Sequence, residues 1–179
     1  MGEEKSDPPL IMMPERSRAE SFARFRPKVI WGAAVFCFIS VVAALSSVRV
    51  LDVRGASMTP GIGEGDNVLV LTRLASLSRG SVIVHRSPGG DPPMVLRRII
   101  ALPGDVVEIR KGRVLINDAD IEEPYVSAQQ NQRQHDMAPI RIPDRTYFVM
   151  ADNRDGAYDS RDWGVVSDQQ IYGKVLRWH

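Results

Sequence analysis

The chain has few of the residues from which disulfide frameworks and metal sites are built. It contains one cysteine and three histidines among 179 residues. A single cysteine excludes an internal disulfide, and no group of cysteine, histidine and acidic residues has the spacing of a metal site. No glycine-rich loop precedes a helical pattern, as phosphate binding would require. We therefore expect neither a metal ion nor another cofactor.

An excess of charge is also missing. The formal net charge is +1 and the sequence pI is near 7.9, which gives no whole-chain reason to expect nucleic acid or an acidic partner. The length leaves room for one domain of about 130 residues together with a short additional segment.

One long uncharged run is present, from residue 29 to residue 48 (VIWGAAVFCFISVVAALSSV). A helix of this length spans about 30 Å, the thickness of the hydrocarbon core of a bilayer. A cleavable signal peptide would have a shorter apolar region, and a buried core helix would rarely stay uncharged for so long. We expect a retained transmembrane anchor.

Positive charges before the run set the expected orientation. Arginine and lysine outnumber acids there, at Arg16, Arg18, Arg24, Arg26 and Lys28 against Glu15 and Glu20. The positive-inside rule predicts a loose cytoplasmic tail over 1–28, the anchor over 29–48 and an extracytoplasmic domain over 49–179.

The segment after the anchor has the pattern of a mainly β domain. Short runs rich in β-branched residues alternate with Gly, Pro, Asp and Asn, and no long stretch shows a helical period. The predicted strands are 48–53, 67–71, 81–85, 95–101, 106–110, 113–117, 146–150 and 171–178, with a two-residue hairpin turn at 111–112. The polar segment 126–138 is predicted to be an exposed loop.

Ser57 lies in a small-residue segment, 55–60 (GASMTP), shortly after the anchor. Such a serine is ordinarily part of a turn and nothing more. Four further segments follow it in order: 65–70 (GDNVLV), 97–105 (RRIIALPGD), 147–154 (YFVMADNR) and 159–164 (DSRDWG).

Together these segments resemble the conserved boxes of the bacterial type I signal peptidases, over the anchor and nearly all of 48–178. The resemblance implies a signal-peptidase-like antiparallel β domain against the outer face of the bacterial plasma membrane, held by one N-terminal transmembrane helix. It implies a serine endopeptidase that removes signal peptides from exported proteins. The implied partners are those signal peptides, the lipid bilayer and the translocation machinery, and no nucleic acid.

The resemblance also assigns roles to individual residues. Ser57 is the implied nucleophile, and its backbone N–H would help to hold the oxyanion. Gly55 stands where some relatives place an additional serine hydroxyl. The side chains at the positions of the substrate pockets, which accept small residues at −1 and −3, are Met58, Ile62, Val95 and Leu96. Two ion pairs around the site are implied, Arg98–Asp152 and Arg161–Asp159; the plain alternative is exposed pairs that contribute little.

The sequence departs from the family at the general base. Relatives use a lysine there, which accepts the serine proton once burial has lowered its pKa to about 7–8. Here the position holds Arg97, whose guanidinium stays protonated in proteins. A serine that often bonds this lysine is replaced by Ala157, and Ala151 and Gly61 are further departures.

No other residue is an obvious substitute for the base. The four lysines, Lys5, Lys28, Lys111 and Lys174, precede the domain or fall at a hairpin tip and in the last strand. His85 could serve only if strand pairing brought it to Ser57; a half-exposed strand histidine is the ordinary interpretation. His135 falls in a polar loop and His179 ends the chain.

Two functions share this fold and ligand. One is an active signal peptidase; the other is a catalytically impaired member that binds exported segments or regulates secretion without cleaving them. Arg97 favours the second function. The rest of the site is nearly complete and includes Ser57, so the active signal peptidase is slightly preferred. An anchored β domain of unrelated function would require the ordered boxes to be coincidental.

Overall fold

The computed structural model describes residues 30–40, 42, 46–72, 76–90 and 93–178. The chain divides into two compact units, Met1–Leu45 and Ser46–His179. In the first, residues 30–40 are helical and exposed, with large apolar side chains such as Trp31 and Phe36. None of the helices in the described ranges is both long and apolar enough to cross a bilayer. The predicted tail and residues 29, 41 and 43–45 of the predicted anchor lie outside those ranges.

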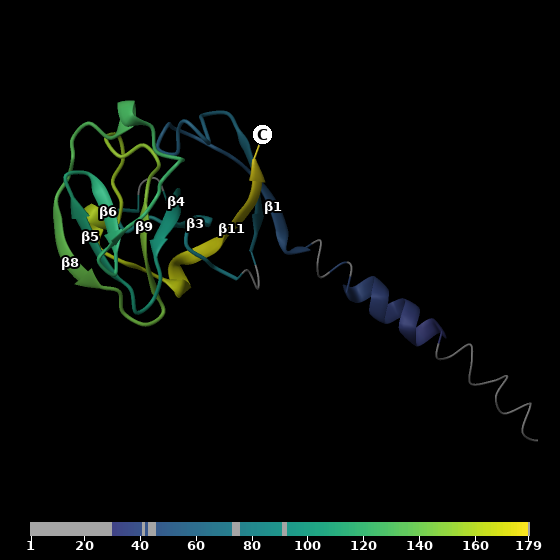
Figure 1. Cartoon of the computed structure of the whole chain (residues 1–179). Helices are drawn as coiled ribbons and strands as arrows, with labels where there is room; N and C mark the ends of the chain where they lie inside the picture. Colours follow the sequence, from purple (N-terminus) through teal and green to yellow (C-terminus); the bar gives the residue numbers. More distant parts are fainter. Residues whose placement is uncertain (1–29, 41, 43–45, 73–75, 91–92, 179) are drawn as a thin grey trace, which may run out of the picture. The chain divides into compact units, whose positions relative to one another are not determined.

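The second unit is built on two antiparallel sheets (Figure 1). The larger has seven strands in the order β1-β2-β11-β3-β4-β9-β10. Their bounds are β1 Val48–Asp52, β2 Asn67–Leu71, β11 Ile171–Trp178, β3 Val82–Arg86, β4 Met94–Ala101, β9 Thr146–Met150 and β10 Val166–Ser167. The mainly β, antiparallel prediction is confirmed.

The smaller sheet has four strands in the order β7-β6-β5-β8. These are β7 Ala119–Asp120, β6 Arg113–Ile116, β5 Val106–Arg110 and β8 Met137–Arg141. The turn between β5 and β6 is the predicted two-residue one, and both of its residues, Lys111 and Gly112, have positive φ. That geometry matches the twist of the flanking strands.

The structure corrects four predicted strands by one residue: β1 ends at Asp52, β4 begins at Met94, β6 ends at Ile116, and β3 is shifted. The strand expected over 81–85 is β3, one residue later. The segment 126–138 is not a single loop, because it contains the 3-10 turn η1 Ala128–Gln130 and the start of β8. Two short helical turns were not predicted, α2 Ser160–Trp163 and η2 Asp168–Gln170.

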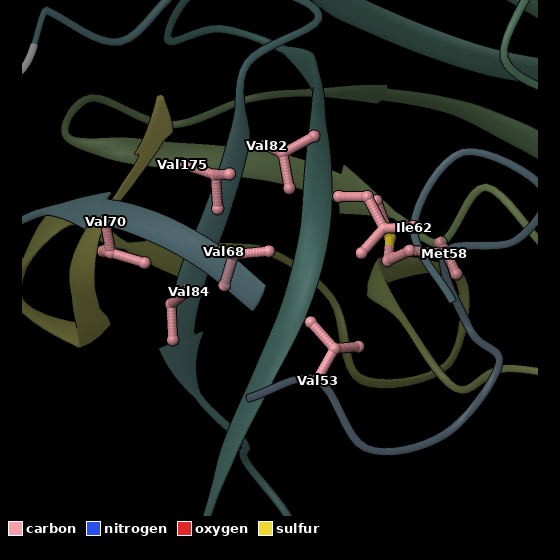
Figure 2. Close-up of a cluster of buried hydrophobic side chains, with 9 residues drawn as sticks. Val53, Met58, Ile62, Val68, Val70, Val82, Val84 and Val175 are labelled. Carbon is pink, nitrogen blue, oxygen red and sulfur yellow. The ribbon is translucent and has the colours of Figure 1, made fainter. Parts of the chain in front are cut away.

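An apolar cluster includes side chains from the turn that carries Ser57 (Figure 2). Met58 and Ile62, from the turn itself, are buried there against valines of β2, β3 and β11. Burial of each side chain of this size contributes about 1.5–3 kcal/mol. The position of Ser57 is therefore fixed by the residue that follows it. Gly173 brings β11 close to β2, because a Cβ at this residue would lie 2.6 Å from the Leu71 carbonyl oxygen.

Candidate functional site: Ser57 and a buried arginine

Ser57 lies in the turn that follows β1, and two other segments hold this turn. The Ser57 carbonyl accepts a hydrogen bond of 3.0 Å from the backbone N–H of Asn153. Gln130 donates from its side chain to Thr59 Oγ1 at 2.7 Å. Gly55, two residues earlier, has φ +89°, a conformation that L side chains rarely adopt. This accounts physically for a glycine at that position.

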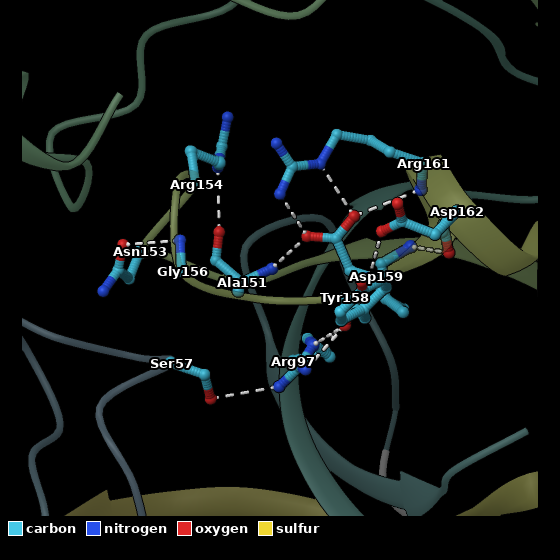
Figure 3. A network of polar contacts seen from close by, with 12 residues as sticks. Ser57, Arg97, Ala151, Asn153, Arg154, Gly156, Tyr158, Asp159, Arg161 and Asp162 are labelled. Atoms are coloured by element: carbon cyan, nitrogen blue, oxygen red, sulfur yellow. Dashed lines mark hydrogen bonds and ion pairs between the residues drawn. The ribbon is translucent and has the colours of Figure 1, made fainter. Parts of the chain in front are cut away.

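Arg97, on β4, reaches the Ser57 hydroxyl (Figure 3). Its Nη1 donates to Ser57 Oγ at 3.1 Å and to the Leu96 carbonyl at 2.5 Å. Its Nε and Nη2 both donate to the Tyr158 carbonyl, at 3.1 and 2.6 Å. The side chain is held by these bonds and Arg97 is only 5% exposed.

In this hydrogen bond Arg97 is the donor and the Ser57 hydroxyl oxygen is the acceptor. A general base would instead accept the proton of the serine hydroxyl. A guanidinium has donors only, so Ser57 Oγ accepts from Arg97 and cannot pass its proton to it. Burial lowers the pKa of Arg97, but a guanidinium stays protonated in proteins, so the group remains a charged donor. Arg97 therefore occupies the position at which the resemblance implies a base, without being able to act as one.

His85 does not supply the missing base. It is fully buried on β3, and its Nδ1 lies 2.8 Å from the Arg86 carbonyl oxygen, to which it must donate. Its Nε2 is then unprotonated, but it has no hydrogen-bonding partner among the described residues, Ser57 included. The ring packs edge-on to Trp163, with centroids 6.2 Å apart. The prediction of a half-exposed histidine at position 85 is therefore wrong, because His85 is buried.

We expect His85 to make stability depend on pH. Burial, with a smaller contribution from the Arg97 charge, lowers its pKa from 6.5 to about 4. The unfolded chain therefore binds a proton between these values that the folded chain does not. The contribution is fully present above about pH 6.5 and is lost as the pH falls toward 4; about 2 kcal/mol should disappear between pH 7 and pH 5. Urea unfolding of wild type and His85→Phe at both pH values measures it.

The matched control is His135→Phe, because His135 is exposed and should leave the pH dependence unchanged. An equal loss of stability in wild type and His85→Phe would show that other groups are responsible.

Two ion pairs of the kind implied by the resemblance lie beside the site. Arg98 bonds both carboxylate oxygens of Asp152 at 2.8 and 2.5 Å, and Asp152 is fully buried. Burial raises the pKa of the Asp152 carboxyl, and the two bonds from Arg98 oppose that shift. Arg161 likewise makes two bonds of 2.8 Å to Asp159, also fully buried. Both pairs are therefore buried, and the alternative of exposed pairs that contribute little does not apply to them.

The residues at the implied pocket positions are divided between two faces. Met58 and Ile62 are buried, and Leu96 packs against the same cluster. Val95 precedes Leu96 on β4, so its side chain points to the opposite face of the sheet. Ala157 also packs against that cluster, and it presents no hydroxyl to Arg97.

Some contacts of the site could not be read from the sequence. The Tyr158 carbonyl, which holds Arg97, is a backbone group, and no residue type signals it. Trp163 stands in one of the ordered segments, and its ring centroid lies 5.8 Å from the Arg97 guanidinium carbon. Asn153 and Gln130 hold the turn from segments distant in sequence.

Comparisons with known proteins agree on one family. A family model described as signal peptidase, peptidase S26, matches residues 27–179. Signal peptidase I S of Bacillus subtilis (strain 168) is 34% identical over 133 residues, or 68% of this chain and 71% of that protein. Signal peptidase I of Bacillus amyloliquefaciens is 32% identical over 132 residues, or 68% and 70%. A crystal structure of a signal peptidase I from Enterococcus faecalis V583 matches with a TM-score of 0.50 and 30% identity, covering 59% of this chain and 100% of that one.

Proposed function

Because this chain belongs to the signal peptidase family, peptidase S26, we propose that it binds the signal peptides of exported proteins and cleaves them only slowly. Family membership supports signal-peptide processing by a serine endopeptidase. The slow cleavage is a property of this chain, and it rests on Arg97.

The single observation that carries the proposal is the bond from Arg97 Nη1 to Ser57 Oγ. Attack by a serine requires a group that takes its proton, and general-base assistance contributes about a hundredfold to ten-thousandfold. Arg97 donates where such a group would accept, and neither ring nitrogen of His85 forms a hydrogen bond with Ser57. Substrate recognition does not depend on this proton. A chain with this site can therefore bind a signal peptide that it hardly cleaves.

The proposed setting is the outer face of the bacterial plasma membrane. The uncharged run 29–48 supports a single anchor, and the positive charges before it support a cytoplasmic N-terminus. Ser57 follows the run closely, so a signal peptide spanning the bilayer would present its end near the serine. The lipid bilayer and the translocation machinery are the proposed surroundings.

Binding and cleavage should be measured on the same full-length protein in lipid vesicles. The probes are a synthetic signal peptide with alanine at −1 and −3 and a matched peptide with phenylalanine at both positions. We expect the alanine peptide to bind more tightly, with unchanged affinity in Ser57→Ala, and to be cleaved slowly or not at all.

Two results would contradict the proposal. Rapid cleavage by wild type that is abolished in Ser57→Ala would show that the site has an effective base. Equal binding of both peptides, or binding of neither, would show that the domain does not recognise signal-peptide ends.

A further inference from the structure

The positive charge of Arg97 is buried, and no described carboxylate forms an ion pair with it. Seven ion pairs occur among the described residues, and Arg97 belongs to none of them. Its acceptors are two backbone carbonyls and the Ser57 hydroxyl, all of them neutral. A buried charge is costly unless an opposite charge compensates it. The site therefore favours a ligand that brings a negative charge.

The nearest carboxylates, Asp159 and Asp162, favour the charged form of Arg97 only through space, and the charge of Arg161 opposes them. Asp159 receives three bonds from Arg161, two from its side chain and one from its backbone N–H, and a further one from the backbone N–H of Ala151. Asp162 accepts from the backbone N–H of Asp159. Figure 3 shows both acids on the far side of the Tyr158 backbone from the Ser57–Arg97 contact. Neither acid contacts the Arg97 guanidinium.

The Ser57 hydroxyl is turned into a donor by the same contact. Because its oxygen accepts from Arg97, its hydrogen must point away from the guanidinium. Within the described part of the chain, neither this O–H nor the Ser57 backbone N–H has an acceptor. Ser57 is partly exposed, whereas Arg97 is buried behind it. A ligand that reaches Ser57 can accept hydrogen bonds from its O–H and its backbone N–H, and the positive charge of Arg97 lies next to these two donors.

We infer that Ser57 and Arg97 form a receptor for the C-terminal carboxylate of a peptide, such as a signal peptide that has already been cut. This inference rests on the proposed function, because the peptide reaches Ser57 through the signal-peptide site. An uncut chain offers a neutral carbonyl at this point, and a cut one offers a full negative charge. Hydrogen bonds to an ionised acceptor are about twice as strong as those between neutral groups. The site thus selects the product of cleavage over its substrate.

The test compares two synthetic peptides that end in the same small residue, one as the free carboxylate and one as the carboxamide. Binding to the full-length protein in lipid vesicles is measured at pH 7. We expect the carboxylate to bind about tenfold more tightly. In Arg97→Gln the two peptides should bind equally. In Arg79→Gln the preference should persist, since this variant loses the same charge at an exposed residue paired with Asp105.

Equal binding of the two peptides to wild type would overturn the inference and leave the proposed function standing. A preference that survives in Arg97→Gln would also overturn it, since the charge would then come from elsewhere. If neither peptide binds, the proposed function fails together with the inference. The wild-type comparison is decisive by itself if Arg97→Gln does not fold.

Discussion

Replacing Arg97 by lysine is expected to raise the rate of signal-peptide cleavage by about a hundredfold to ten-thousandfold. Position 97 is buried and lies within hydrogen-bonding reach of Ser57 Oγ. A lysine in such a place can lose its proton near neutral pH, after which its amine accepts the serine proton. The rate should rise with pH as the lysine deprotonates. Adding Ala157→Ser should increase the gain, because a hydroxyl there can orient the amine. Cleavage of a model preprotein by full-length protein in vesicles measures the effect.

Two controls isolate this proton transfer. Ser57→Ala combined with Arg97→Lys should abolish the gain, since the nucleophile is then missing. Arg79→Lys makes the same replacement at an exposed position and should change nothing. If Arg97→Lys cleaves no faster than wild type at any pH from about 6 to 9, the missing base is not what limits cleavage.

Most of the strands could be predicted because their residues alternate or form β-branched runs between turn residues. β2, β5, β9 and β11 have the predicted bounds. β8 was not predicted, because its first two residues end the polar segment 126–138, which was expected to be a loop, and Pro139 is a residue that strands disfavour. The structure places β8 at the edge of its sheet, where a missing backbone N–H is tolerated. β7 and β10 have two residues each, too few for any period to show.

The candidate site was predictable in its membership but not in the contacts that hold its side chains. The ordered segments identified Ser57 and Arg97 as neighbours, and the structure brings them to 3.1 Å. The sequence also shows that an arginine has no acceptor to offer. It could not show that the Tyr158 carbonyl takes two of the arginine bonds. Nor could it show that His85 is buried, because its burial depends on how Trp163 packs.

Removing the carboxylate of Glu123 is expected to cost about 3–5 kcal/mol of stability. Arg154, in the segment that follows β9, is only 2% exposed and donates to both Glu123 oxygens, at 3.0 and 2.5 Å. In Glu123→Ala its guanidinium would remain buried without a counter-charge, and only the bond from its Nε to the Ala151 carbonyl would be left. Urea unfolding at pH 7 measures the loss.

Two comparisons show whether the buried charge is the cause. Glu108→Ala removes the same group from a pair whose arginine side chain is 60% exposed, and should cost at most about 1 kcal/mol. Arg154→Met added to Glu123→Ala should recover part of the lost stability, because the uncompensated charge is then gone. If the double variant is no more stable than Glu123→Ala, the loss comes from packing around Glu123. The Ser57 turn should loosen in Glu123→Ala, since Asn153, which holds the Ser57 carbonyl, directly precedes Arg154.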